Sequence, residues 1–140
     1  MREIDSKAIS KGVQFFVFGN LDLAMDALPI QLIPKLKKKF PQHTFTILDP
    51  NEEWDVSRDM YIIDTVVGIE VVTIFTDLDV FLDGPKVTCH DFDAYTNLKF
   101  LKKLGKIDTT YIIGIPSGHP EDRVLKELNK AIESFSEKKY

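Results

Sequence analysis

Three short apolar runs most constrain the fold of this chain. They are residues 13–19 (VQFFVFG), 60–66 (MYIIDTV) and 109–116 (TTYIIGIP), and each is nearly continuous in hydrophobicity instead of alternating with polar residues. Strands of this kind are buried on both faces, which is typical of a parallel sheet covered by helices on each side. We therefore expect these runs to be the central strands of such a sheet.

Segments with helical spacing separate the strands. Residues 29–40 place apolar side chains near three- and four-residue intervals, and Pro34 within them should kink or break the helix. Residues 93–104 repeat in the same way, with Asp93 as the expected N-cap. A further helix opens at Pro120. The alternation of strands and helices predicts a three-layer α/β/α fold with a mostly parallel sheet.

Two weaker extended segments complete the expected sheet, and a third is a candidate for an additional edge strand. Residues 44–48 (TFTIL) predict the second strand. Residues 70–75 (EVVTIF) follow the 60–66 strand after a connection too short for a parallel crossover, so we expect those two strands to pair antiparallel. Residues 86–89 (KVTC) offer a further short edge strand. The prediction is a mixed five-stranded sheet with one antiparallel edge strand.

Length and composition favour one domain. With 140 residues and 44% hydrophobic content, the chain can bury a single core, so we expect residues 1–140 to form one domain with ragged ends at 1–12 and 137–140. The net charge of -4 gives no basic footprint, which disfavours nucleic acid and anionic membranes as partners. A single cysteine cannot form an internal disulfide. We expect a cytoplasmic protein that acts as a monomer.

The carboxyl ends of the predicted strands carry candidates for chemistry. Open α/β sheets bind ligands there, at the point where the strand order reverses. In a 2-1-3 order, the loop GNLDLAMD after the first strand brings Asp22 and Asp26 near Asp64 of the third strand. An aspartate inside an apolar strand is costly unless it has a partner or a metal, so Asp64 is the most informative single residue.

His90 is the third candidate. It lies in VTCHDFDAYTNL, between an extended segment and the amino end of a helix, where the helix dipole keeps the imidazole neutral and able to bind a metal. Asp26, Asp64 and His90 could then form an open metal site. Each residue also has a purely structural alternative to metal binding. Asp26 could be a helix N-cap, Asp64 could cap a backbone turn, and His90 could bond to a carbonyl at a helix entrance.

Other chemistries find less support in the chain. Cys89 and His90 are neighbours in a segment expected to be extended, so they point to opposite faces and do not form a nucleophile and base. Ser117 lacks a G-x-S-x-G context. The glycine-rich phosphate loops GxGxxG and GxxxxGK[ST] are absent from the sequence, which argues against nucleotides.

Three motifs, in their order, resemble those of the hydrogenase maturation endopeptidases. FGNLDLAMDALP is similar to the family's Gly-Asn loop, YIIDTVVG to its Asp-bearing third strand, and CHDFDAYTNLKFLKKLGKID to its histidine motif. The last is especially similar to the branch that acts on hydrogenase 3 type and archaeal enzymes. These enzymes trim the C-terminal extension from the large-subunit precursor of nickel-iron hydrogenases, so the resemblance implies a protease whose partner is that precursor.

The resemblance also implies a site. Asp26, Asp64 and His90 would be the catalytic and metal-contacting trio, and nickel already inserted in the substrate would be the recognition element. There are departures: the acidic residue Asp26 stands between Met25 and Ala27, where the family usually has two acidic residues and glycine. The sequence DPNEEW replaces a glycine-rich loop, which leaves the substrate hydrogenase open.

Two rivals come from other classes of protein. A signalling receiver domain would need an acidic pair directly after strand 1 and a lysine at the end of strand 5, whereas this chain has Gly-Asn and IPSG there. A non-catalytic scaffold could use the same crevice to hold a protein tail without cutting it.

Overall fold

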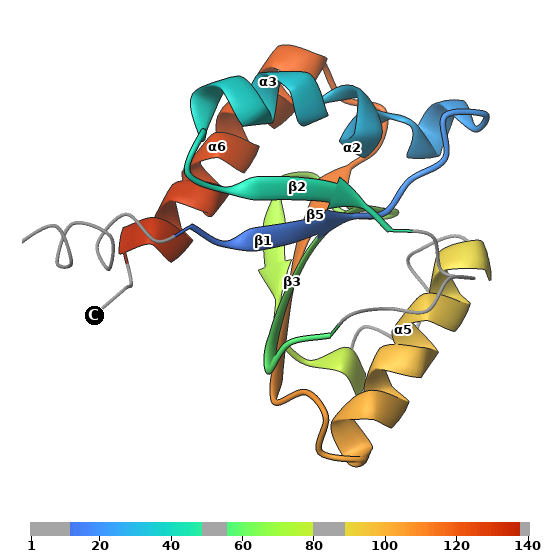
Figure 1. Ribbon diagram of the computed structural model, residues 1–140. Coiled ribbons are helices and arrows are strands. Elements are labelled where there is room, and N and C mark those ends of the chain that lie inside the picture. The colour runs from blue at the N-terminus through green and yellow to red at the C-terminus, as the bar shows by residue number, and fades with distance from the viewer. Residues whose placement is uncertain (1–11, 49–55, 80–88, 138–140) are drawn as a thin grey trace, which may run out of the picture.

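A computed structural model describes residues 12–48, 56–79 and 89–137, without the side chains of residues 25, 89–93, 136 and 137. The expected ends, 1–12 and 137–140, therefore lie almost wholly outside the described residues. The described chain forms one mixed sheet between two helical layers (Figure 1). No helix in these ranges is long and apolar enough to cross a membrane.

The sheet confirms the predicted strands and the 2-1-3 order. In the described residues it has five strands in the order β2-β1-β3-β5-β4, and β4 is antiparallel to its neighbour. β1, β2, β3 and β5 are parallel. The bounds are β1 Gln14–Val17, β2 Thr44–Ile47, β3 Asp59–Val66, β4 Thr73–Phe75 and β5 Thr109–Pro116.

The predicted pairing of β4 with β3 is wrong. β5 pairs with β3 along the full length of both strands, from Asp59↔Thr109 to Val66↔Pro116, so β3 has no edge left for β4. The connection 67–72 instead carries the chain to the far side of β5, where β4 pairs antiparallel. The candidate strand 86–89 lies outside the described residues except for Cys89, which is helical.

Polar contacts hold this connection against the last helix. The guanidinium of Arg123 donates to the carbonyl of Glu70 (2.6 Å), and the Val72 N–H donates to the Glu127 carboxylate (2.9 Å). The Val72 N–H, and after it Arg123, lower the pKa of Glu127 below its ordinary value. The connection to the edge strand is therefore fixed by specific contacts.

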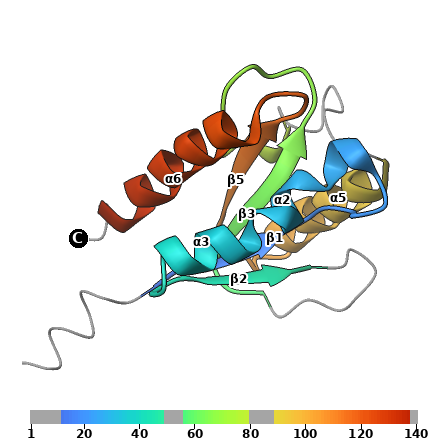
Figure 2. The same ribbon diagram turned by 90° about the horizontal axis from the view of Figure 1, so that it is seen from above.

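The helices form the two outer layers that the sequence predicts. Figure 1 shows α2, α3 and α6 on one face of the sheet and α5 on the other, and Figure 2 shows α3 and α6 in the same layer. Lys35 of α3 forms an ion pair with Glu121 of α6 (2.7 Å). The bounds are α2 Leu28–Gln31, α3 Ile33–Lys39, α5 Cys89–Lys103 and α6 Glu121–Glu137.

Two helix boundaries test the sequence predictions. The expected break near Pro34 is confirmed, because α2 ends and α3 begins around Leu32, which places Pro34 in the first turn of α3. The predicted start of the next helix at Asp93 is wrong, since α5 begins at Cys89 and Asp93 lies in its second turn. The sequence has an aspartate at position 91, in the first turn, and acidic residue types are favoured at the amino end of a helix, which suits the earlier start.

Apolar side chains fill the space on both faces of the sheet. The cluster under α2, α3 and α6 includes Phe15, Leu36, Ile63, Ile113 and Leu128. The cluster under α5 includes Phe18, Met60, Ile62, Tyr95 and Leu98. Because alternate residues of a strand point to opposite faces, β3 contributes Ile63 to the first cluster and Ile62 to the second.

Candidate active site

The loop after β1 folds back on itself and delivers Asp26. The Asn20 N–H donates to the Asp26 carbonyl (2.9 Å), and the Asp26 N–H donates to the Leu23 carbonyl (2.9 Å). The Asn20 side chain accepts from the Asp22 N–H (2.9 Å), which forms an Asx turn. These bonds support the short 3₁₀ turn η1 (Ala24–Asp26), in which Asp26 is only 2% exposed, whereas Asp22 is exposed.

Gly19 lets this turn pack against the end of β1. A Cβ atom added at Gly19 would lie 2.9 Å from the Asp26 carbonyl oxygen and 3.1 Å from Ile30 Cγ1. The first distance is shorter than real Cβ contacts allow, and the backbone oxygen cannot move away without displacing η1. The glycine of the Gly-Asn motif is thus required by a close approach to the backbone that carries Asp26.

Gly19→Ala should therefore lower the free energy of unfolding by about 1–3 kcal/mol, the usual range for overpacking. Chemical denaturation measures this loss. Asp22→Glu adds one methylene to an exposed position of the same loop and should change stability by less than about 0.5 kcal/mol. Equal stability of the Gly19→Ala variant and the parent protein would contradict the close approach.

Asp64 is completely buried in β3, and each of its carboxyl oxygens accepts a hydrogen bond from a described residue. Oδ1 accepts from the Thr65 N–H (2.8 Å), and Oδ2 accepts from the Tyr95 hydroxyl (2.9 Å). Tyr95 is itself fully buried on α5, and its ring packs edge-to-face on Phe18, with ring centroids 5.4 Å apart. The hydrogen bonds offset the cost of burying the carboxyl group and fix its orientation.

The structure brings Asp26 and Asp64 to the same end of the sheet. β1 and β3 are parallel neighbours, with Val17 opposite Ile63, so β1 ends at the level of Asp64. The η1 turn that carries Asp26 contacts β3. The alternative of Asp26 as a helix N-cap is excluded, because Ala27 occupies the N-cap position of α2. Both carboxyl groups thus lie at the carboxyl ends of the strands where the strand order reverses, which is where open α/β sheets bind ligands.

His90 is the second residue of α5, so it lies inside the first turn of the helix and not, as predicted, between an extended segment and the helix start. It precedes Tyr95 by five residues, or roughly one and a half turns, on the helix whose Tyr95 contacts Asp64. The His90 side chain lies outside the described part, so convergence of the trio stays a prediction. Among the described side chains, no group of three or more His, Cys, Asp or Glu residues is arranged to hold a metal ion.

The predicted extended conformation of Cys89 and His90 is wrong. Both residues are helical and not extended. Adjacent positions on a helix also do not face each other, so a nucleophile and base pair remains disfavoured on different grounds.

Tyr95 is the site residue that sequence reasoning missed. It lies within residues 93–104, whose helical spacing gives no sign of a polar role, and its side chain is fully buried. A buried tyrosine hydroxyl normally needs a hydrogen-bond partner, and the carboxyl group of Asp64, inside an apolar strand, needs one as well. These two needs together were the signal in the sequence that could have predicted the pairing of Tyr95 with Asp64.

The fold and the site define an α/β protein with an open mixed sheet and two buried carboxyl groups at adjacent strand ends. Among solved structures, the chain is similar to "hydrogenase maturating endopeptidase HybD from E. coli", with a TM-score of 0.60 and 15% identity over 89% of this chain and 92% of that one. This likeness confirms the predicted α/β/α fold, which the chain shares with that protein. No protein-family model and no curated protein matches the chain.

Proposed function

We propose that this protein is an endopeptidase that removes the C-terminal extension of a nickel-loaded [NiFe]-hydrogenase large-subunit precursor. The observation that carries the proposal is the placement of Asp26 and Asp64, two buried carboxyl groups, at one end of adjacent strands. The shared fold supports it, because the similar solved structure is that of a hydrogenase maturating endopeptidase. The proposal keeps the expectation of a cytoplasmic monomer without nucleic-acid or membrane partners.

In this proposal Asp26, Asp64 and His90 contact the nickel that the precursor presents. Nickel accepts mixed oxygen and nitrogen ligands, so two carboxylates and an imidazole form a suitable set. The bonds from Thr65 and Tyr95 hold Asp64 in one orientation, and a carboxylate that accepts hydrogen bonds can still ligate a metal. The protein would thus recognise a precursor whose nickel has been inserted.

Peptide hydrolysis in this scheme uses water and no serine or cysteine nucleophile. Water adds across the scissile amide, which gives a new carboxyl end on the large subunit and a free amine on the released extension. Bound nickel can polarise the carbonyl or lower the pKa of the attacking water. The contribution of this chain is to orient the precursor at the strand ends.

The two rivals make different predictions. A receiver domain has an all-parallel sheet in the order 2-1-3-4-5, whereas here β4 is antiparallel and lies beyond β5, so that class does not fit. A non-catalytic scaffold fits the same fold and would bind the precursor tail without cutting it.

Incubation with the cognate precursor tests the proposal. The precursor is supplied nickel-loaded or nickel-free, and its mass is followed. We expect loss of a C-terminal peptide from the loaded form and an unchanged mass of the nickel-free form. Tight binding with unchanged mass would establish the scaffold instead, and equal cleavage of both forms would rule out recognition through nickel.

A further inference from the structure

The outer edge of β2 carries backbone groups that point away from the sheet. The Thr44 N–H donates to the Val13 carbonyl, and the Leu48 N–H donates to the Val17 carbonyl, both at 3.0 Å. Because successive residues of a strand direct their N–H and C=O groups to opposite sides, Phe45 and Ile47 direct theirs outward. In the part of the chain that the structure describes, β2 borders the sheet and no strand pairs with that side.

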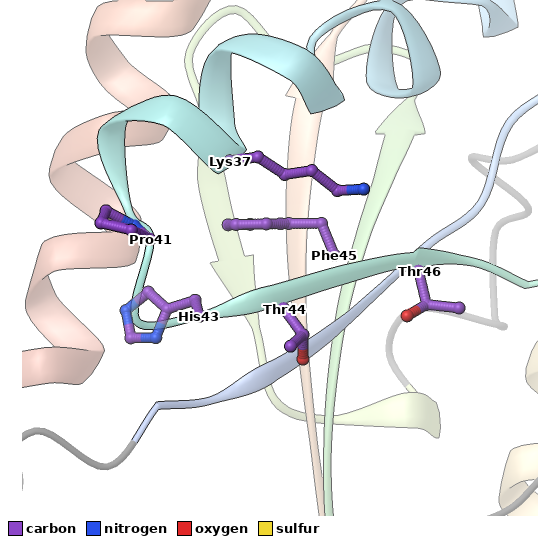
Figure 3. Close-up of a pocket in the computed structure, with 6 residues that line it drawn as sticks. All are labelled: Lys37, Pro41, His43, Thr44, Phe45 and Thr46. Carbon is purple, nitrogen blue, oxygen red and sulfur yellow. The ribbon is translucent and has the colours of Figure 1, made fainter.

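A hollow of about 460 Å³ follows this edge (Figure 3). It is lined by Thr44, Phe45 and Thr46 in succession. Consecutive strand side chains point to opposite faces, so a hollow that touches all three follows the edge between the two faces. Lys37, Pro41 and His43 complete its lining. The space is therefore placed where an added strand would lie.

The charge beside the hollow is positive. Lys37, Lys38 and Lys39 form the last turn of α3, and all three are exposed. Figure 3 shows the Lys37 side chain extending over Phe45, alongside β2. Lys35 on the same helix is paired with Glu121, but no ion pair among the described residues involves residues 37–39. On a chain of net charge -4, this cluster is a local basic patch.

We propose that the outer edge of β2 binds an extended, acidic segment of a partner protein, which adds to the sheet as a further strand. Backbone bonds to Phe45 and Ile47 would supply the affinity, and carboxylates facing Lys37–Lys39 would supply the selectivity. A second copy of this chain is a poor occupant, because an edge-to-edge dimer would bring two lysine clusters together. The proposal does not depend on whether the crevice cleaves a precursor.

A titration of the full-length ¹⁵N-labelled protein with a synthetic peptide tests this interaction. The probe is an eight-residue peptide in which glutamate alternates with valine and threonine. At about 1 mM peptide, the weak end of peptide recognition, we expect hydrogen exchange at the Phe45 and Ile47 amides to slow by roughly tenfold. The Thr44 and Leu48 amides already donate to β1, so they serve as internal controls with little change.

Variants and altered peptides separate strand addition from charge attraction. Lys37→Glu with Lys38→Glu should weaken binding by roughly tenfold or more, whereas Lys106→Glu, between α5 and β5, should leave it unchanged. A peptide with lysine in place of glutamate, and one N-methylated at alternate amides, should bind at least about tenfold more weakly.

Three outcomes would overturn the proposal. The first is no change at Phe45 and Ile47 with the acidic peptide, which would leave the lysines as charges that merely keep the edge from aggregating. The second is equal binding of the acidic and basic peptides. The third is dimerisation through β2, seen as a concentration-dependent mass in sedimentation and abolished by Ile47→Pro.

Discussion

Alanine at Asp26 or at His90 is expected to abolish trimming of the nickel-loaded precursor. Each change removes one proposed ligand of the substrate's nickel, so the precursor is no longer held with its scissile bond in a reactive position. We expect the initial rate to fall roughly a hundredfold or more, which corresponds to about 2.7 kcal/mol or more of lost transition-state stabilisation. Mass spectrometry of the precursor over time measures this rate.

Controls for this result come from the same loop and from the fold. Asp22 lies four residues before Asp26 and is exposed, so Asp22→Ala should trim at the parent rate. Because Asp26 is buried, Asp26→Asn should be compared as well, since it keeps the side-chain shape while removing the charge. All variants should retain the cooperative unfolding of the parent. Full activity of the Asp26 or His90 variant would make the assignment of that residue wrong.

The elements that sequence predicted well are those with a strong local pattern. The apolar run at 109–116 matches β5 at both ends, and α6 begins one residue after Pro120. The expected break in the helix near Pro34 also follows from the chemistry of one residue. Proline lacks the backbone N–H donor and is tolerated only in the first turn of a helix. Local patterns of this kind predict an element whether or not its partners are known.

Strand pairing was harder because it depends on competition between distant segments. Residues 70–75 are extended in character, but that character does not say which edge they will join. β5 lies much further along the chain and takes the whole free edge of β3, so β4 joins the opposite side of β5. Gly114 illustrates the constraint: a Cβ there would lie 2.6 Å from Val66 Cγ2 and 3.0 Å from Phe75. The tight contact among these strands cannot be read from the 70–75 segment.

In the candidate site, too, one residue could be identified from the sequence, whereas its contacts depend on the tertiary structure. Asp64 was identified from the sequence because a carboxylate in an apolar strand is costly, and it is fully buried. Its partner Tyr95 lies 31 residues away, on the helix α5 that covers one face of the sheet. The sequence offered both residues, but only the tertiary structure joins them. The position of Asp26 likewise depends on Gly19, because the absence of a Cβ atom there lets the Asp26 carbonyl oxygen approach the backbone closely.

Tyr95→Phe is expected to destabilise the protein by about 1–3 kcal/mol. The change removes one hydroxyl and keeps the ring that packs on Phe18, so the loss reports mainly on the bond to Asp64, buried at both ends. Chemical denaturation gives the free energy of unfolding. Tyr111→Phe is the matched control, because Tyr111 is half-buried and stacks on Tyr61, with no hydroxyl bond described. It should cost less than about 0.5 kcal/mol.

A double-mutant cycle with Asp64→Ala separates this bond from general packing. Once the carboxylate is gone, Tyr95→Phe should cost at least about 0.5 kcal/mol less than it does in the parent, since residues in direct contact are coupled by about 0.5–3 kcal/mol. Additive costs would show that the Tyr95 hydroxyl does not hold Asp64. If the coupling is present, Tyr95→Phe should also slow trimming of the nickel-loaded precursor while Tyr111→Phe does not. Asp64 on β3 would then depend for its orientation on α5, the same helix that carries His90 in its first turn.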